Sequence, residues 1–292
     1  MPLFSDYAHK LRTIYIPESK SVTYHETDTF DFPVGTIVSK TFLYHSENNQ
    51  VQLDSNWDGD PDSLNMETAQ LIETRLLVRQ AHGWDALPYV WRGNDAFLAI
   101  SGDLLSLKSS QGDLNYLVPS KNQCASCHAT NHTTGELLPI GLKARHLNRL
   151  QPGHAINQLA LFEFTNLPED VPRGAQWDDV DVEHKARSYL DINCGHCHNP
   201  QGAADTSGLL LDYQNHALRD MGACKPPIAA GRGSGGFLYS IVPGKADESI
   251  MTFRLETTDP GAMMPELGRS IAHKEGLALV REWINSLDGQ CL

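Results

Sequence analysis

A five-residue cysteine–histidine pattern occurs twice in this chain and limits what the chain can be. It reads CASCH at residues 124–128 and CGHCH at residues 194–198. Cys-x-x-Cys-His is the attachment site of c-type haem. The two thiols can reach the two vinyl groups on one edge of the porphyrin, and the histidine that follows supplies an axial nitrogen to the iron. The sequence therefore predicts two covalently attached haem c groups, held by Cys124, Cys127, His128, Cys194, Cys197 and His198.

Two other uses of paired cysteines fit less well. A four-cysteine zinc site usually separates its pairs by about 15–20 residues, whereas Cys127 and Cys194 lie 67 residues apart. Neither that zinc site nor a thioredoxin-like dithiol needs a histidine after each pair. A zinc-stabilised binding module would also be colourless, which would separate it from a haem protein by eye.

Cys224 and Cys291 are the two cysteines outside the motifs. Thioether attachment of haem takes place outside the cytoplasm, so we expect a periplasmic or otherwise exported protein. An oxidising compartment allows Cys224 and Cys291 to pair as a disulfide. The opening MPLFSDYAHK has no basic segment followed by an apolar one, so we expect that a signal peptide has been removed or truncated.

Net charge narrows the choice of partners. The 292 residues carry a formal net charge of −13, which disfavours nucleic acid and anionic membrane surfaces. No apolar run reaches the roughly eighteen residues that a membrane-spanning helix needs. The expected partners are other redox proteins of the periplasm.

The chain is expected to form an α+β fold of two domains. Runs of β-branched and aromatic residues predict strands at 35–45, 70–80, 86–91 and 95–101. LKARHLNRL and AINQLALFEF are predicted to be helical, and NLPEDVPRGAQWDD (166–179) has the proline-rich, acidic composition of a linker. We therefore expect a β-rich domain at 1–165 with the first haem, a linker at 166–179, and a helical domain at 180–292 with the second haem.

Helical periodicity flanks the second motif. Apolar residues share one helical face before the motif and again near the end of the chain: Val182, Ala186, Tyr189 and Leu190, then Leu277, Val280, Trp283, Ile284 and Leu287. Gly289 follows the last helix as a stop signal. A helix that leads into the haem motif, a loop-rich middle and a final aromatic helix resemble an all-α class I cytochrome c domain. In that family a loop methionine binds the iron from the other side.

Two adjacent methionines occupy the loop DPGAMMPELGRS at 259–270. Met264 lies 66 residues after His198, a distance typical of the class I family, and thioether sulfur is a soft ligand that suits haem iron. We expect Met264 to be the second axial ligand of this haem, with Met263 as its hydrophobic neighbour or substitute. The alternative is that both methionines pack beside the haem edge.

Longer stretches resemble a bacterial family of periplasmic dihaem c-type cytochromes. The resemblance covers nearly the whole chain and rests, besides the motifs, on PLFSDYAHKLR, FDFPVGTIVSKTF, LIETRLLVRQAHGW, LPIGLKARHLNR, AGRGSGGFLYSIVPG and TTDPGAMMPELGRS. It implies a periplasmic electron carrier. Members of that family normally carry further residues before PLFSDY.

The first haem lacks a methionine loop of the class I kind, because no methionine lies between Met66 and Met221. A β-rich segment followed at once by Cys-x-x-Cys-His resembles the β-sheet haem proteins of the cytochrome c-prime-beta type, in which the distal side of the iron can be open. An open site and a sixth ligand both remain candidates. The residues considered as that ligand are Met66, His82, His132, His146 and His154.

A third metal is suggested by DSNWDGDPDSLN at 54–65, which matches much of the calcium-loop template. Oxygen ligands would come from Asp54, Asn56, Asp58 and Asp60. Position twelve is Asn65 instead of a bidentate glutamate. An acidic turn between strands is the alternative reading.

The expected function is transfer of single electrons between periplasmic redox partners through two haems. The alternative is a haem enzyme, or a sensor of gas or peroxide, in which an open first haem meets a small molecule and the second haem relays electrons. The sequence favours an electron carrier over a catalyst and names no donor or acceptor.

Overall fold

The structure is a computed structural model that describes residues 1–53, 57, 59–228 and 230–292. The chain divides into two compact units. The sheet unit comprises Tyr7–His128 and Glu136–Arg173. The loop–helix unit comprises Met1–Asp6, Ala129–Gly135 and Gly174–Leu292. Each unit therefore gathers pieces of the chain that are distant in sequence.

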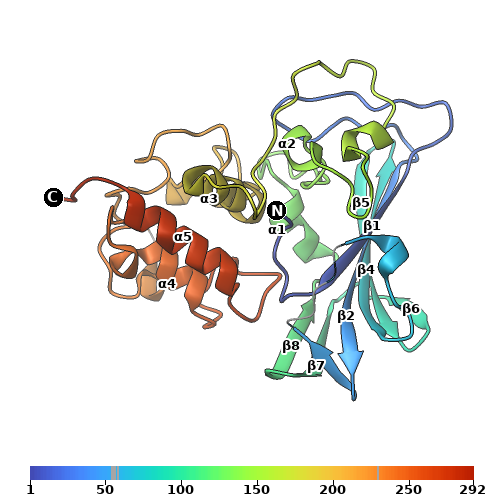
Figure 1. The fold of residues 1–292 in the computed structure, drawn as a ribbon, viewed down its shortest axis with the longest axis horizontal. Helices are drawn as coiled ribbons and strands as arrows, with labels where there is room; N and C mark the ends of the chain where they lie inside the picture. The colour runs from blue at the N-terminus through green and yellow to red at the C-terminus, as the bar shows by residue number, and fades with distance from the viewer. Residues whose placement is uncertain (54–56, 58, 229) are drawn as a thin grey trace. The chain divides into compact units, whose positions relative to one another are not determined.

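The sheet unit is built on one eight-stranded sheet (Figure 1). The strands follow the order β6-β5-β4-β2-β3-β7-β8, with β1 paired to β2 outside this path. Neighbouring strands are antiparallel except for the short contact of β3 with β7. The bounds are β1 His9–Tyr15, β2 Ile37–Glu47, β3 Gln50–Gln52, β4 Ala69–Gln80, β5 Gly83–Arg92, β6 Asp95–Leu98, β7 Asp103–Ser109 and β8 Gly112–Val118.

The four strands predicted from the sequence are present as β2, β4, β5 and β6. The sequence pattern did not predict β1, β3, β7 or β8. Lys10 and Arg12 place charges in β1, where an alternating apolar face would otherwise be recognised. β7 and β8 are each seven residues long, and their pairing with each other through a tight hairpin stabilises them more than propensity does.

The core of the sheet unit is aromatic. Phe32 packs edge-on against Trp84, with ring centroids 5.9 Å apart, and Tyr44 packs in the same way against Tyr116. A buried cluster gathers residues from the sheet and from the segments before and after it: Val22, Phe30, Phe32, Leu77, Trp84, Ala86, Cys124, Ala144 and Leu159. Cys124 of the first haem motif is thus part of this core.

Three helices form the centre of the loop–helix unit: α3 Val182–Leu190, α4 Ile250–Glu256 and α5 Lys274–Ser286 (Figure 1). The apolar faces of α3 and α5 share one core, to which Ala186, Tyr189, Leu190, Leu279, Val280, Trp283 and Ile284 contribute. The two helices approach closely at Gly276, where an added Cβ would lie 2.3 Å from the Tyr189 ring. The helices predicted at both ends of this region are therefore present.

The predicted all-α class I cytochrome c-like domain is wrong. Between α3 and α4 the described residues form the π-turn Asp191–Gly195, turns, short 3-10 segments and isolated β-bridges such as Ala223 with Ile241. Left-handed glycines explain this, because Gly208 and Gly235 end the 3-10 turns Asp205–Ser207 and Gly231–Ser234 after one turn each. The whole chain is richer in strand than in helix, and its helices are short.

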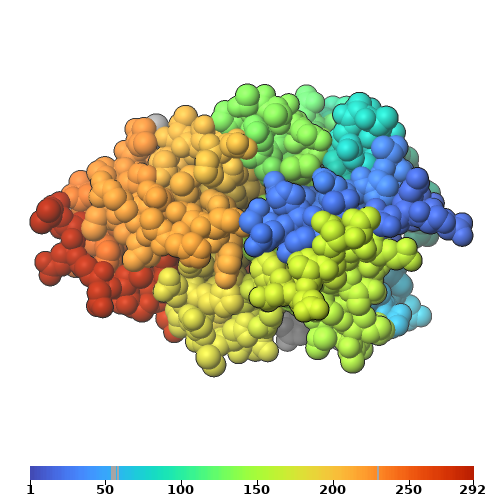
Figure 2. All heavy atoms as spheres, turned by 90° about the horizontal axis from the view of Figure 1, so that it is seen from above, coloured from blue at the N-terminus to red at the C-terminus, as the bar shows by residue number. Residues whose placement is uncertain are grey.

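Helices predicted after the first motif are also much shorter than expected. LKARHLNRL contributes only the four-residue α2 Ala144–Leu147, and AINQLALFEF contributes the 3-10 turn Gln158–Leu161. The expected linker contains the boundary at which the chain passes from the sheet unit, at Arg173, to the loop–helix unit, at Gly174. In the space-filling view the segment around residues 150–165, yellow-green in Figure 2, lies at the surface, where Leu150 and Leu161 are exposed.

None of the helices in the described ranges has the length and apolar character needed to cross a membrane.

Candidate haem-attachment sites

The first motif begins with a short capped turn. Ser120 and Gln123 cap each other, since the Ser120 N–H donates to Gln123 Oε1 (2.9 Å) and the Gln123 N–H donates to Ser120 Oγ (3.2 Å). A 3-10 turn, Asn122–Cys124, then continues into α1 Ala125–His128. This helical geometry places Cys124 and Cys127 one turn apart, with His128 directly after them.

A backbone carbonyl fixes the ring of His128. His128 Nδ1 lies 2.6 Å from Leu138 O, and the Leu138 N–H donates back to His128 O at 2.8 Å. A carbonyl oxygen can only accept, so Nδ1 carries the imidazole proton in the neutral ring. Nε2 is then the nitrogen with a lone pair, which is the arrangement that a metal-binding histidine uses.

The second motif lies where α3 changes its winding. Asp181 caps the start of α3, because its side chain accepts from the His184 N–H at 3.0 Å. The helix then widens into a π-turn, Asp191–Gly195, which contains Cys194. Such π-turns are rare in proteins as a whole, but many of those known lie at functional sites. The His198 N–H closes the motif by donating to Cys194 O at 2.9 Å.

Ser207 orients His198 in the way that Leu138 orients His128. His198 Nδ1 lies 3.2 Å from Ser207 Oγ, and the Ser207 hydroxyl gives its single proton to Ala204 O at 2.6 Å. His198 Nδ1 must therefore be the donor in the pair, which leaves the lone pair on Nε2. Burial, together with His196 and Arg254, lowers the pKa of His198 to about 4, so the ring is neutral at neutral pH.

The four motif cysteines keep their thiols. None of them is in a disulfide. Burial raises the pKa of Cys194 to about 12 and also raises the pKa of Cys124, so both remain protonated at neutral pH. Each motif therefore has two cysteines outside any disulfide and one histidine whose Nδ1 is engaged by a protein oxygen, which is the donor set that a c-type haem requires. The residues of both motifs fit that group.

Two buried polar atoms near the second motif support the same fit. Trp283 is fully buried, and its Nε1 has no hydrogen-bond partner among the described residues. His196, inside the motif, is also buried, and its Nδ1 is likewise without a partner in the described part of the chain. Buried polar groups normally have partners, so these atoms indicate that the unit accommodates a further polar group.

Two arginines hold the methionine loop. Arg254 Nε donates to Ala262 O at 2.9 Å, and Arg269 Nε donates to Met264 O at 3.0 Å. The same arginines act electrostatically on the second motif, Arg254 on His198 and Arg269 on Cys194. The structure therefore brings the methionine loop and the second motif together. Met263 is buried and Met264 is half-buried.

The residues considered as a distal ligand of the first haem are mostly exposed or engaged elsewhere. Met66 is 59% exposed. His82 pairs with Asp85 and His154 with Asp60. His132 belongs to the loop–helix unit, where its Nδ1 lies 3.0 Å from the carbonyls of Gln201 and Gly202. His146 lies in α2 of the sheet unit, and the choice of a sixth ligand stays a prediction.

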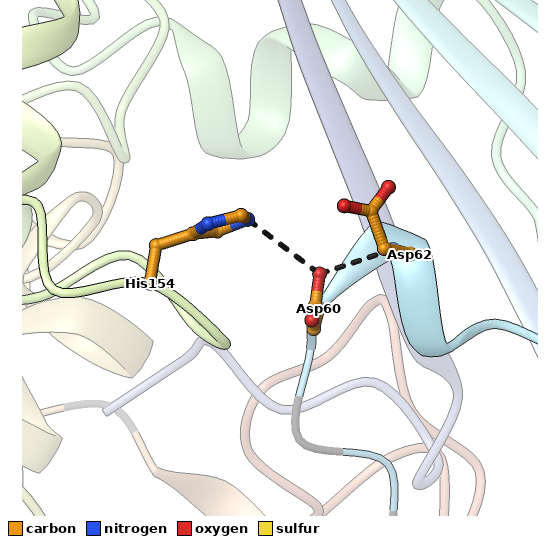
Figure 3. Close-up of side chains that lie close together, drawn as sticks. All are labelled: Asp60, Asp62 and His154. Atoms are coloured by element: carbon orange, nitrogen blue, oxygen red, sulfur yellow. Dashed lines mark hydrogen bonds and ion pairs between the residues drawn. The ribbon is translucent and has the colours of Figure 1, made fainter.

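The calcium loop falls largely outside the described residues, because Asp54, Asn56 and Asp58 are not among them. Asp60 does form a small cluster with Asp62 and His154, whose ligand atoms lie within 4.8 Å of one another (Figure 3). Asp60 Oδ1 accepts from the Asp62 N–H at 3.0 Å and pairs with His154 Nε2 at 3.8 Å. Asp60, Asp62 and His154 offer three donor atoms within the described part of the chain, two of them from exposed residues, and the calcium loop stays a prediction.

Cys224 and Cys291 form a disulfide, with Cα atoms 5.1 Å apart. The bond joins the turn-rich middle of the loop–helix unit to the last residues of the chain.

Family models, curated proteins and solved structures were compared with this chain, and none of them matches it. The functional proposal therefore rests on the residues of the two motifs and on their surroundings.

Proposed function

We propose that the protein is a dihaem c-type cytochrome that transfers single electrons between periplasmic redox partners. One observation carries the proposal. In both Cys-x-x-Cys-His motifs the Nδ1 proton of the histidine is donated to a fixed oxygen of the protein, Leu138 O or Ser207 Oγ. In each neutral ring the lone pair is then on Nε2, the nitrogen that would bind iron, and the two cysteines of each motif are outside any disulfide. A cysteine pair with a role other than haem attachment would not require a neighbouring histidine oriented through its Nδ1 in this way.

The residues of the chain hold and orient the two haems. Cys124 with Cys127, and Cys194 with Cys197, provide the thiols for covalent attachment, while His128 and His198 provide one axial nitrogen each. Met264 is the proposed second axial ligand of the second haem, and Arg269 holds its backbone carbonyl in place. A bound haem supplies the one-electron chemistry, and the protein tunes it through axial ligands and burial.

The proposed location is outside the cytoplasm. The Cys224–Cys291 disulfide is consistent with an oxidising compartment, and thioether attachment also requires export. The proposed partners are soluble or membrane-attached redox proteins of the periplasm.

A count of covalent haems tests the proposal directly. The protein is produced in a periplasm with haem-attachment machinery, and haem per chain is measured by pyridine haemochrome and by the mass of the denatured chain. We expect two haems. The double variants Cys124→Ala/Cys127→Ala and Cys194→Ala/Cys197→Ala should each carry one, whereas Cys224→Ser/Cys291→Ser should keep two. Haem that is absent, or that is extracted intact by acidified solvent, would overturn the proposal.

A second candidate function is supported by the surroundings of the first motif. Met66 is exposed, and His82, His132 and His154 have other partners; without His146 as sixth ligand, the first haem would have an open distal side where a small molecule such as nitric oxide or peroxide could react. Carbon monoxide should then bind the reduced Cys194→Ala/Cys197→Ala variant, which retains only the first haem. A low-spin spectrum that carbon monoxide does not change would favour electron transfer alone.

A further inference from the structure

Three cationic residues lie directly opposite one another on three adjacent strands of the sheet unit. Arg12 of β1 pairs with Lys40 of β2, and Lys40 pairs with Arg75 of β4. Residues that are directly opposite in an antiparallel sheet project from the same face, where like charges destabilise the pairing. We call Arg12, Lys40 and Arg75 the cation row. The row is unusual in a chain whose net charge is −13.

The nearest carboxylate is already engaged. Glu73 is fully buried and accepts two hydrogen bonds from Arg75, at 2.8 and 2.5 Å. It also accepts one from the Tyr116 hydroxyl at 2.6 Å. Glu73 therefore compensates Arg75 and contributes only long-range attraction to Lys40.

Neither Arg12, which is exposed, nor Lys40, which is half-buried, has a carboxylate partner of this kind among the described residues. Arg12 donates to the backbone carbonyl of Lys10 at 3.1 Å. Lys40 takes part in no ion pair within the described ranges, and its Nζ lies 5.2 Å from the centre of the Phe42 ring. Arg75 is over the same ring, at 4.4 Å. The aromatic face thus attracts both cations without neutralising either of them.

Arg149 adds a fourth cation. It follows α2 in the sheet unit and acts electrostatically on Arg12. Its Nε is buried, and no hydrogen-bond partner for it occurs among the described residues. A buried guanidinium nitrogen without an acceptor is costly, so the position of Arg149 beside the row points to a missing acceptor.

The cation row also lies close to the first haem motif. Arg75 acts electrostatically on Cys124, and Lys40 interacts in the same way with Cys127. An anion from solution and a propionate of the first haem carry the same chemistry toward the row, and the test below separates the two.

We propose that the cation row, with Arg149, binds a small inorganic oxoanion beside the first haem motif. Guanidinium groups present parallel N–H donors that match the oxygens of such an anion, and the ammonium of Lys40 adds a further charged donor. The proposal does not depend on the redox function, because the residues that carry it are not haem ligands.

The test measures sulfate and nitrite binding to the haem-loaded protein by calorimetry, in dilute buffer at slightly acidic pH. We expect saturable binding of one anion per chain. Lys40→Met and Arg12→Met should each weaken binding about tenfold or more, the size of a lost charged hydrogen bond. Lys40→Arg keeps the charge and should keep binding, as should Lys108→Met, which removes an exposed lysine of β7 outside the row. Arg75 is left intact because Glu73 depends on it.

The melting temperature provides a second readout, which does not depend on the affinity for an anion. Lys40→Met removes repulsion within the row, so in the absence of anion its melting temperature should be equal to or above that of the unchanged protein. Binding seen only in the Cys124→Ala/Cys127→Ala variant would show that the first haem occupies the row. Binding that Lys40→Met and Arg12→Met leave unchanged, or no binding to the haem-loaded protein, would equally overturn the proposal.

Discussion

Asp6 accepts hydrogen bonds from Ser270, a residue 264 positions further along the chain. The Ser270 N–H donates to both carboxylate oxygens at 2.8 and 2.9 Å, the Ser270 hydroxyl donates at 2.9 Å, and the Ile271 N–H donates at 3.0 Å. Asp6 is buried, so these bonds are shielded from water. The beginning of the chain thereby fixes the end of the methionine loop.

Replacing Asp6 with Asn should destabilise the protein by about 1–3 kcal/mol, because the amide nitrogen cannot accept from the donors that now meet a carboxylate oxygen. Chemical denaturation measures the loss. Asp288→Asn, an exposed acid near the end of the chain, is the control and should change stability by less than about 0.5 kcal/mol. Equal stability of the two variants would contradict the role given to Asp6.

Gly276→Ala should destabilise the protein although it lies within α5. Alanine is normally the better helix former by about 1 kcal/mol, but here its Cβ would lie 2.3 Å from the Tyr189 ring. We expect a net loss of about 1–3 kcal/mol from this overpacking. The cost should shrink in a Tyr189→Leu background, because the clash is with the ring. An unchanged cost there would place the strain elsewhere.

Local patterns predicted part of this fold correctly. The apolar spacing that includes Tyr189 and Trp283 identified α3 and α5, since burial against a shared core imposes a helical period. The class I architecture was wrong because left-handed glycines such as Gly208 stop the chain after single turns between those helices. Their effect depends on φ, which a residue pattern does not report.

For the candidate sites, too, the sequence identifies residues that form a local pattern but not residues that the fold brings together. Cys-x-x-Cys-His is a local pattern, so the motif residues could be read directly. The oxygens that orient the histidines, Leu138 O and Ser207 Oγ, could not, because a carbonyl is the same in every residue and serine is common. The cation row was missed for a related reason: Arg12, Lys40 and Arg75 become neighbours only through strand register.

Met264→Ala and Met263→Ala should have separable effects. With Met264 as iron ligand, its removal should abolish the weak sulfur-to-iron absorption band and lower the reduction potential of the second haem. Met263 is 7% exposed, so its removal should leave the band in place and cost about 2–5 kcal/mol of stability. Absorption spectra and denaturation of both variants distinguish these roles. Loss of the band only in Met263→Ala would assign the ligand to Met263.

Cys224→Ser/Cys291→Ser should lower the free energy of unfolding by about 4 kcal/mol, the chain-entropy value for a closed loop of this length. The sequence separation of the two cysteines is 67 residues. Reductant should destabilise the unchanged protein by a similar amount and leave the double variant unaffected. Sensitivity of the double variant to reductant would mean that another bond is involved.

Oxoanion binding should weaken as pH rises through neutrality. Burial, with the like charges of Arg75 and Arg12, lowers the pKa of Lys40 to about 7. Below that value Lys40 is protonated and the row carries its full charge, whereas above it the row loses one charge and one charged donor. Calorimetric affinities measured over about one pH unit on either side should show the decline. Lys40→Arg should remove it, because a guanidinium stays protonated throughout this range.

The division of the chain between its units sets an order for biosynthesis. A ribosome completes Tyr7–His128 and Glu136–Arg173, the whole of the sheet unit, before most of the loop–helix unit has been made. Met1–Asp6 precede the sheet unit in the sequence, yet the partners of Phe4 and Asp6 are Asn193 and Ser270, which are synthesised much later. Met1–Asp6 must therefore stay undocked until the loop–helix unit has been made, and the surroundings of the second Cys-x-x-Cys-His motif are completed after the sheet unit.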